Sequence, residues 1–191
     1  MRKATVAMIL SAFVAMNLLF SWDPGHAQVA DGLPALTVVV RHADRASDDK
    51  DTLLSDKGKD RANDLKAALS DIKFSTIITS DYIRTRDTAK PLVQALGLMP
   101  IEVPYKDVDI ETHLKGVVIT VSKHAGGAVL VVGHSETVLE IIARLKGPRF
   151  TNNICRNTYD HLFVLVSVAG KAQLVHSRFG AASPPPQGSC M

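Results

Sequence analysis

The sequence predicts an α/β protein, built as a three-layer sandwich with a mostly parallel sheet and an antiparallel hairpin at one edge. Three short apolar runs rich in β-branched residues alternate with stretches in which apolar residues recur every three or four positions. Short continuous apolar runs are typical of parallel strands that helices cover on both faces. Two more strand-like segments, separated by a turn, follow near the end of the chain. This order favours helices on either side of one sheet.

The three buried strands are expected at residues 36–40, 75–79 and 128–132. Each run is four or five apolar or β-branched residues long, which is too short for a helix and normal for a strand. The hairpin is expected to pair residues 162–168 with residues 172–179 across the turn Ala-Gly-Lys.

Three helices are expected between the strands, because apolar residues recur there at helical spacing. Gly97 ends the second helix, and Gly147 with Pro148 ends the third. The apolar positions are, in chain order, Ala62, Leu65, Leu69 and Ile72; Ala89, Leu92 or Val93, and Leu96; and Val138, Ile141 or Ile142, and Leu145.

Residues 114–121 leave two interpretations open. The β-branched residues Val117, Val118, Ile119 and Val121 favour a strand. The spacing of the apolar residues and the position between two strands favour a helix.

The N-terminus predicts export. Arg2 and Lys3 precede an apolar run over residues 4–20, and the small residues Gly25 and Ala27 follow it. This pattern is typical of a secretory signal peptide at residues 1–27, followed by one domain at 28–180 and a flexible tail at 181–191. The apolar run is longer than usual for a leader, so an uncleaved membrane anchor is the alternative. Export would place the protein in the periplasm or outside the cell.

Composition excludes several classes of protein. The 191 residues are 46% hydrophobic and 21% charged, as in one soluble globular domain. A net charge of +3, with six Phe, three Tyr and one Trp, does not favour nucleic-acid binding. Two cysteines exclude a four-cysteine zinc site. An oxidising compartment would permit a bridge between Cys155 and Cys190, and the sequence leaves that open.

Histidines and arginines follow the predicted strands at the point where each strand ends. Arg41 and His42 follow the first, Arg84 comes soon after the second, and His134 follows the third. Ligands bind at the carboxyl ends of strands in such sheets. Arginine binds a phosphoryl group through paired hydrogen bonds, and histidine can accept the group as a nucleophile. Two histidines among arginines do not make a metal site.

Four motifs at these positions resemble those of the histidine phosphatase superfamily, in its phosphoglycerate-mutase-like branch. Arg-His-Ala at 41–43 stands for the family's Arg-His-Gly, and Leu-Ser-Asp-Lys-Gly at 54–58 matches Leu-Ser-x-x-Gly. Residues 80–89 match Ser-x-Leu-x-Arg-Ala-x-x-Thr-Ala with two changes, and 133–135 is Gly-His-Ser. One motif alone is a weak signal, but four in order are specific. The departures Ala43, Tyr82 and Thr85 remove no catalytic group.

The resemblance implies a role for each matching residue. His42 would be the nucleophile, and Arg41 and Arg84 would hold the phosphate oxygens. His134 would donate a further hydrogen bond to them. Ser135 would start a helix whose free N–H groups favour an anion. No cofactor is expected, because the cationic side chains neutralise the phosphate.

The proton donor for the leaving group is the least defined part of the site. Family members supply it from a carboxylate after the second helix, where Asp107, Asp109 and Glu111 are the candidates. These acids could equally form a solvated loop or the charged start of the next helix. Glu136, or no dedicated acid, is the alternative.

The expected function is an exported phosphatase that hydrolyses phosphate monoesters through a phosphohistidine. The stretch between Arg84 and Gly133 has little room for the insertion that shapes the closed site of a mutase, which must exclude water. Its substrate would be a small molecule or a phosphate ester of the cell envelope, with no nucleic-acid partner and membrane contact only through an uncleaved leader. A non-catalytic phosphate-binding relative and a phosphomutase or phosphotransferase are the alternatives. Arg45 is expected at the rim, and residues 48–51 are expected to form a solvated loop.

Overall fold

The computed structural model describes residues 35–168 and 171–185, so the predicted leader and the end of the tail lie outside it. Its strands and helices follow the predicted order. Between the second helix and the third long parallel strand, the chain forms one short strand and one helix. The elements are β1 (Leu36–Arg41), α1 (Asp56–Ala68), β2 (Thr76–Ser80), α2 (Ile83–Leu96), β3 (Ile101–Val103), α3 (Ile110–Ser122), β4 (Ala128–Gly133), α4 (Val138–Arg144), β5 (His161–Val168) and β6 (Lys171–Arg178).

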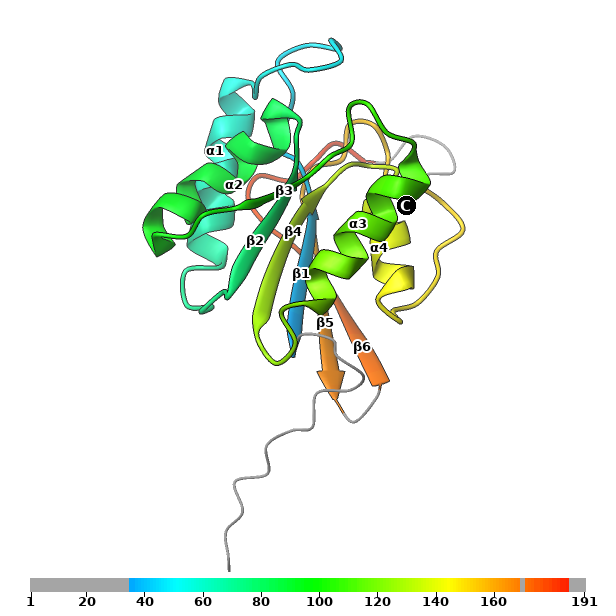
Figure 1. The fold of residues 1–191 in the computed structure, drawn as a ribbon. Coiled ribbons are helices and arrows are strands. Elements are labelled where there is room, and N and C mark those ends of the chain that lie inside the picture. The colour runs from blue at the N-terminus through cyan, green and yellow to red at the C-terminus, as the bar shows by residue number, and fades with distance from the viewer. Residues whose placement is uncertain (1–34, 169–170, 186–191) are drawn as a thin grey trace, which may run out of the picture.

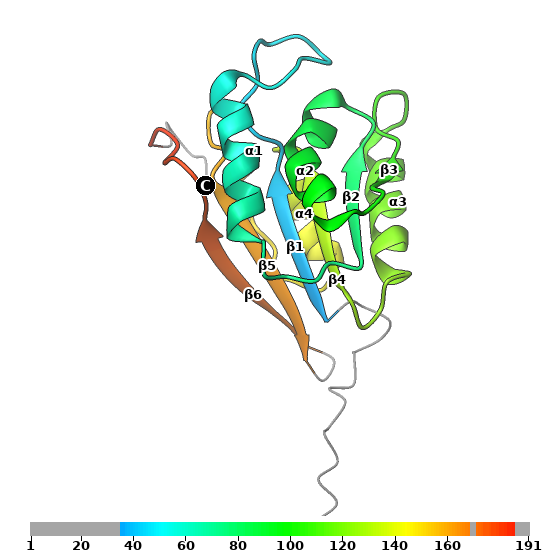
Figure 2. The ribbon, with the colours of Figure 1, turned by 90° about the vertical axis from the view of Figure 1, so that its left-hand side faces the viewer.

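The six strands form one mixed sheet in the order β3-β2-β4-β1-β5-β6, which can be followed across Figure 2. The strands β3, β2, β4 and β1 are parallel. Strand β5 runs antiparallel to β1, and β6 runs antiparallel to β5. The predicted parallel sheet with an antiparallel hairpin at its edge is therefore confirmed.

Helices cover both faces of the sheet, with α1 and α2 on one side and α3 and α4 on the other (Figure 1). Side chains of β1 alternate between the two layers, as the pleat of a strand requires. Val38 and Val40 pack with α1 and α2, whereas Val39 packs with α3 and α4. Burial on both faces explains why the strands are continuously apolar.

The ambiguous residues 114–121 form part of helix α3. Leu114, Val117 and Val121 are buried at helical spacing, while Ile119 is 57% exposed. Asp109 caps the helix, because its side chain accepts a hydrogen bond from the Thr112 amide at 2.9 Å. The amphipathic spacing and the cap outweigh the strand preference of the β-branched residues.

Arg61 joins helix α1 to the loop after β1 and to the chain that follows β6. Its buried guanidinium pairs with Asp44 and donates to the carbonyl oxygens of Phe179 (3.2 Å) and Ala181 (2.8 Å). The Tyr159 amide donates to the Ser183 hydroxyl at 2.9 Å. The first residues of the expected flexible tail thus bond to the domain. Within the described ranges, no helix has the length and apolar character to cross a membrane.

Candidate functional site

Strands β1 and β4 bring the two histidines together. Arg41 pairs with Gly133 at the ends of the strands, and the His42 amide donates to the Gly133 carbonyl at 2.9 Å. His42 and His134 therefore leave the sheet side by side, with ring centroids 5.4 Å apart. Both side chains are buried. The parallel register alone places the two motifs in contact.

The tautomer of His42 is set by a main-chain contact. Its Nδ1 lies 2.8 Å from the Ala43 carbonyl oxygen, which can only accept, so Nδ1 carries the proton and Nε2 has a free lone pair. Burial, followed by the charge of Arg41, holds the pKa of His42 well below its usual value. The ring is therefore neutral at pH 7, the form in which it can attack a phosphorus atom.

Arg41 is held in place by main-chain oxygens. Its Nη1 donates to the carbonyls of Cys155 (2.7 Å) and Thr158 (2.9 Å), and its guanidinium carbon lies 4.2 Å from the centre of the Tyr159 ring. Burial lowers its pKa to about 10, so the side chain stays charged at neutral pH. Cys155 is disulfide-bonded, whereas Cys190, the other cysteine in the sequence, lies outside the described residues.

Arg84, the second residue of α2, lies between a loop and His134. Its Nη1 donates to the Lys50 carbonyl at 2.8 Å, and its Nη2 donates to Nδ1 of His134 at 3.1 Å. The guanidinium carbon lies 4.1 Å from the centre of the Tyr82 ring. The structure thus brings together all four residues for which the sequence predicts catalytic roles.

Three arginines at this edge of the sheet have unused donors. The Nε atoms of Arg41, Arg84 and Arg45 are buried, and none has a hydrogen-bond partner. A buried donor without a partner is costly, and three of them close to His42 suit an anion with several oxygens. Their charges are also felt at His42, whose pKa is lowered by burial first and then by Arg41, Arg84 and Arg45.

His134 is fixed in one tautomer by its neighbours. A guanidinium can only donate, so Nδ1 accepts from Arg84 and Nε2 carries the proton. Nε2 lies 2.9 Å from the Ser80 hydroxyl, which in turn lies 3.0 Å from the Thr85 hydroxyl. Burial, followed by the neighbouring His42, lowers the pKa of His134 well below its usual value. In this tautomer His134 has no N–H left for a phosphate, so the expected donor role requires a second proton.

The other motif positions support the end of β1. The Thr88 hydroxyl accepts from the Ala43 amide at 2.8 Å. Ser55, the cap of α1, accepts from the Gly58 amide at 3.1 Å, and its own amide donates to the Asp44 carbonyl at 3.0 Å. A Cβ atom at Gly58 would overlap that carbonyl oxygen. The motif at 54–58 therefore requires glycine where α1 approaches the loop after His42.

The first part of the domain matches a known family. Residues 36–106 match the model of the histidine phosphatase superfamily, branch 1. This stretch holds the first three motifs, and the sheet places the fourth beside them. Over this stretch the chain resembles the histidine phosphatase superfamily. Comparison with curated protein sequences finds no match.

Solved structures of histidine phosphatases share the fold at low identity. A protein from Agrobacterium tumefaciens, provisionally assigned as phosphohistidine phosphatase SixA, is 20% identical, with 77% of this chain and 99% of that chain covered and a TM-score of 0.56. Protein histidine phosphatase SixA complexed with tungstate is 16% identical (75% and 96% covered, TM-score 0.54). A mycobacterial glucosyl-3-phosphoglycerate phosphatase is 14% identical (73% and 96% covered, TM-score 0.51).

The candidate site has a carboxylate that the sequence indicated only as an alternative. Glu136 accepts from the Tyr105 hydroxyl at 3.0 Å through Oε1 and from the Ser135 hydroxyl at 2.9 Å through Oε2. The Tyr105 ring centre lies 4.9 Å from that of His134. Burial and Glu136 together raise the pKa of Tyr105. Glu136 is thus joined to the residues around His134.

The three acids after α2 make other contacts. Asp109 caps α3, and Glu111 binds Arg144 of α4 through both oxygens, at 3.1 and 2.7 Å. Asp107 is exposed. Segment 104–110 instead places Tyr105 against His134 in the candidate site. A pattern of acids cannot show that two of them serve as a helix cap and as the partner of an arginine on another helix.

Helix α4 begins later than the sequence suggested. Its first residue is Val138 and its cap is Thr137, so Ser135 lies before the helix and not at its start. The reason is a turn after β4, in which the His134 amide donates to the Thr137 hydroxyl at 2.9 Å and the Val138 amide donates to the His134 carbonyl at 3.0 Å.

The acidic loop at residues 48–51 is bound to the site and is more than a solvated loop. Asp51 accepts from the Ile83 amide at 2.9 Å and forms an ion pair with Lys106. The pKa of Asp51 is lowered overall. Burial raises it, but the hydrogen bond from Lys106 and the neighbouring donors and charges lower it. The Lys50 carbonyl holds Arg84. Contacts to main-chain atoms carry no sequence signal, which is why the loop's role could not be predicted.

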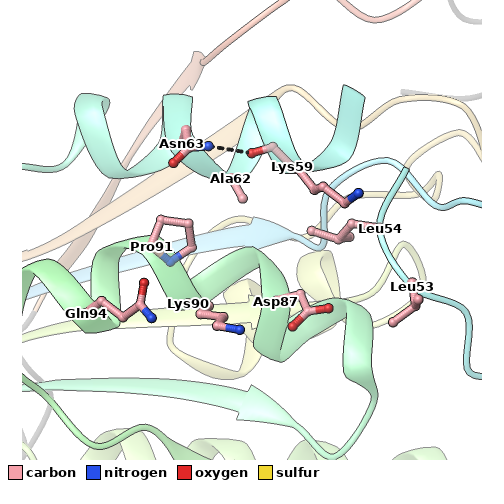
Figure 3. A pocket seen from close by; sticks show the side chains of 9 residues that line it. All are labelled: Leu53, Leu54, Lys59, Ala62, Asn63, Asp87, Lys90, Pro91 and Gln94. Atoms are coloured by element: carbon pink, nitrogen blue, oxygen red, sulfur yellow. Dashed lines mark hydrogen bonds between the residues drawn. The ribbon is translucent and has the colours of Figure 1, made fainter. Parts of the chain in front are cut away.

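A separate hollow of about 280 Å³ lies between α1 and α2 (Figure 3). Leu54, Ala62 and Pro91 are among its apolar lining, and Lys59 and Lys90 are among its charged lining. None of His42, Arg41, Arg84 and His134 lines it. Among residues 35–168 and 171–185, no three His, Cys, Asp or Glu side chains are grouped so as to hold a metal ion.

Proposed function

We propose that the protein hydrolyses phosphate monoesters through a phosphohistidine at His42. The observation that carries this proposal is the free Nε2 lone pair of a neutral His42 beside three buried guanidinium Nε atoms without partners. A nucleophile next to preorganised donors for an oxyanion is the arrangement that phosphoryl transfer requires.

The reaction has two steps that balance. Nε2 of His42 attacks phosphorus, the P–O ester bond breaks with its electron pair on the leaving oxygen, and that oxygen takes a proton. Water then attacks the phosphohistidine, the P–N bond breaks with its electron pair on Nε2, and phosphate leaves. Arg41 and Arg84 hold the phosphoryl oxygens in both steps, because their Nε donors are unpaired.

Glu136 is proposed as the proton donor to the leaving oxygen and as the acceptor of the water's proton. Its two oxygens are held by Tyr105 and Ser135, so its orientation is set from two sides. The Glu136 charge also raises the pKa of Arg41, which burial lowers. A carboxyl group near the phosphate-binding arginines can exchange a proton with the ester oxygen.

Turnover of p-nitrophenyl phosphate by the purified protein, without added metal, tests the proposal. Wild-type protein releases nitrophenol and phosphate in equal amounts, and His42→Ala does not. Binding of phosphate without turnover would indicate a non-catalytic relative. Transfer of the phosphoryl group to an added alcohol or sugar, in place of release to water, would indicate a phosphotransferase or mutase.

Export of the enzyme to the periplasm or beyond the cell is also proposed. It is supported by the basic start, apolar run and small residues over positions 1–27. Fractionation of the host cell with N-terminal sequencing tests it, and the expected species begins near Gln28. An intact Met1 species in the membrane fraction would indicate an anchor, and protein in the cytoplasm would contradict export.

A further inference from the structure

Arg45 and Arg156 share one carboxylate. Oδ1 of Asp48 lies 2.8 Å from Nη2 of Arg45 and 2.6 Å from Nη2 of Arg156. Arg45 follows β1, and Arg156 belongs to the segment between α4 and β5. The carboxylate thus joins two segments that are far apart in the sequence. The pKa of Asp48 is lowered, first by its hydrogen bond with Arg156.

Both arginines lie close to the catalytic residues. Cys155, directly before Arg156, and Thr158, two positions after it, supply the carbonyls that hold Arg41. The Arg45 charge adds to the lowering of the pKa of His42, after burial and Arg41. Arg45 also keeps a buried Nε without a partner, although its Nη2 is engaged by Asp48. Arg45 therefore pairs with the exposed Asp48 carboxylate through Nη2, and its buried Nε is unpaired like those of Arg41 and Arg84.

We propose that Arg45 and Arg156 form a second anion subsite, which binds a carboxylate or second phosphate on the alcohol part of the substrate. This inference rests on the proposed function and names a substrate class for it: phosphate monoesters with a further negative group. Asp48 occupies the subsite in the free protein.

Exchange of Asp48 for a substrate anion is physically reasonable. The side chains of Asp48 and Arg156 are 76% and 71% exposed, and water screens ion pairs at such positions, so breaking them costs little. Arginine pairs with the planar oxygens of a carboxylate or phosphate at two points. A substrate anion would meet both guanidinium groups, as Asp48 does.

A matched set of substrates tests the subsite. Phenyl phosphate has no charge besides its phosphoryl group, and its ortho, meta and para carboxyphenyl analogues add one carboxylate at three different positions. The readout is the ratio of kcat/KM for each carboxylated ester to kcat/KM for phenyl phosphate. Variants Arg156→Gln, Arg45→Gln and Asp48→Asn are compared with wild type. Arg149→Gln, at an exposed position of the same segment, is the control.

The wild-type protein is expected to prefer at least one carboxylated isomer. Arg156→Gln and Arg45→Gln lower that ratio roughly 10-fold or more, as expected when a charge-assisted hydrogen bond is lost. Asp48→Asn raises the ratio, because the competing carboxylate is gone, and Arg149→Gln leaves it unchanged.

Three outcomes would overturn the subsite: no preference for any isomer, equal losses on all substrates in Arg156→Gln, or a lowered ratio in Asp48→Asn. Equal losses would show that Asp48 only ties two segments together. Turnover of phenyl phosphate by wild type reports separately on the proposed function. If wild type turns over none of the esters, the proposed function fails, and the subsite fails with it.

Discussion

Nη2 of Arg84 donates to Nδ1 of His134 at 3.1 Å, so the ring nitrogen that meets Arg84 carries no proton. The other ring nitrogen faces the Ser80 hydroxyl at 2.9 Å. His134 can therefore bind a phosphate oxygen only if Nδ1 exchanges Arg84 for that oxygen and takes up a proton. Binding of an oxyanion and protonation of His134 are linked by this contact.

Tungstate should bind with uptake of about one proton. In the free protein, burial and the neighbouring His42 lower the pKa of His134, so the ring is neutral near pH 7. A bound dianion favours the protonated ring, which makes affinity fall as pH rises through the pKa of the complex, by at most about tenfold per pH unit. Calorimetry in buffers of different ionisation enthalpy measures the proton count.

His134→Asn supplies the matched comparison for proton uptake. The asparagine amide donates a hydrogen bond without gaining a proton, so uptake should disappear while tungstate still binds. Equal proton uptake in the variant and in wild type would contradict the linkage.

Loss of Arg84 should slow hydrolysis strongly. Arg84→Ala removes a buried, unpaired donor from the proposed phosphate position and should lower kcat by about 10²–10³, the range for one preorganised transition-state donor. Arg84→Lys should recover only part of this loss, because lysine lacks the planar fork that meets both His134 and the phosphate. Steady-state kinetics with p-nitrophenyl phosphate measures both. Near-normal kcat in Arg84→Ala would mean that another arginine holds the phosphate.

Glu136→Gln should slow esters with poor leaving groups selectively. An alkyl phosphate needs a proton on the leaving oxygen, whereas p-nitrophenolate leaves without one. The variant should therefore lose about 10²–10³ in kcat on alkyl esters and far less on p-nitrophenyl phosphate, in line with general acid catalysis. Asp107→Asn, at an exposed position, is the control. A selective loss in Asp107→Asn, Asp109→Asn or Glu111→Gln, and not in Glu136→Gln, would return the role to the segment after α2.

The sequence predicted the sheet, and it predicted that His42, Arg41, Arg84 and His134 would meet at its edge, because both follow local patterns. Apolar runs defined the strands, and parallel pairing then required that Arg41 and His134 meet at one edge. Residues 114–121 remained ambiguous, because helix α3 depends on the Asp109 cap and on packing that a β-branched run conceals.

The rest of the site depends on contacts between segments. The Lys50 carbonyl that holds Arg84, and the Cys155 and Thr158 carbonyls that hold Arg41, are main-chain atoms with no signature in the sequence. The sequence offered Glu136 only as an alternative, because its hydrogen bond with Tyr105, 31 positions away, has no local pattern. Asp109 and Glu111 looked equivalent to it until their capping and pairing contacts were known.

Gly58→Ala should weaken both stability and activity. The added Cβ would overlap the Asp44 carbonyl, two residues after His42, so the backbone must move. We expect a loss of about 1–3 kcal/mol in the free energy of unfolding, as for other overpacked sites. A shift of His42 should also lower kcat by about 10-fold or more. Urea denaturation and kinetics measure the two effects.

Asp60→Ala, at an exposed position of the same helix, is the control for Gly58→Ala. It should retain wild-type kcat and unfold within about 0.5 kcal/mol of wild type. If Gly58→Ala matched wild type in both measurements, the close approach of α1 to the loop after His42 would not matter for the site.

The central claim is that His42 carries the phosphoryl group. Purified protein is mixed with a phosphate monoester, quenched in alkali because phosphohistidine is labile in acid, digested, and analysed by mass spectrometry for the position of the added phosphoryl group. The account predicts phosphorylation at Nε2 of His42, reduced to background in His42→Ala, which keeps its fold. A phosphoryl group on His134 and never on His42, or hydrolysis that persists in His42→Ala, would contradict it.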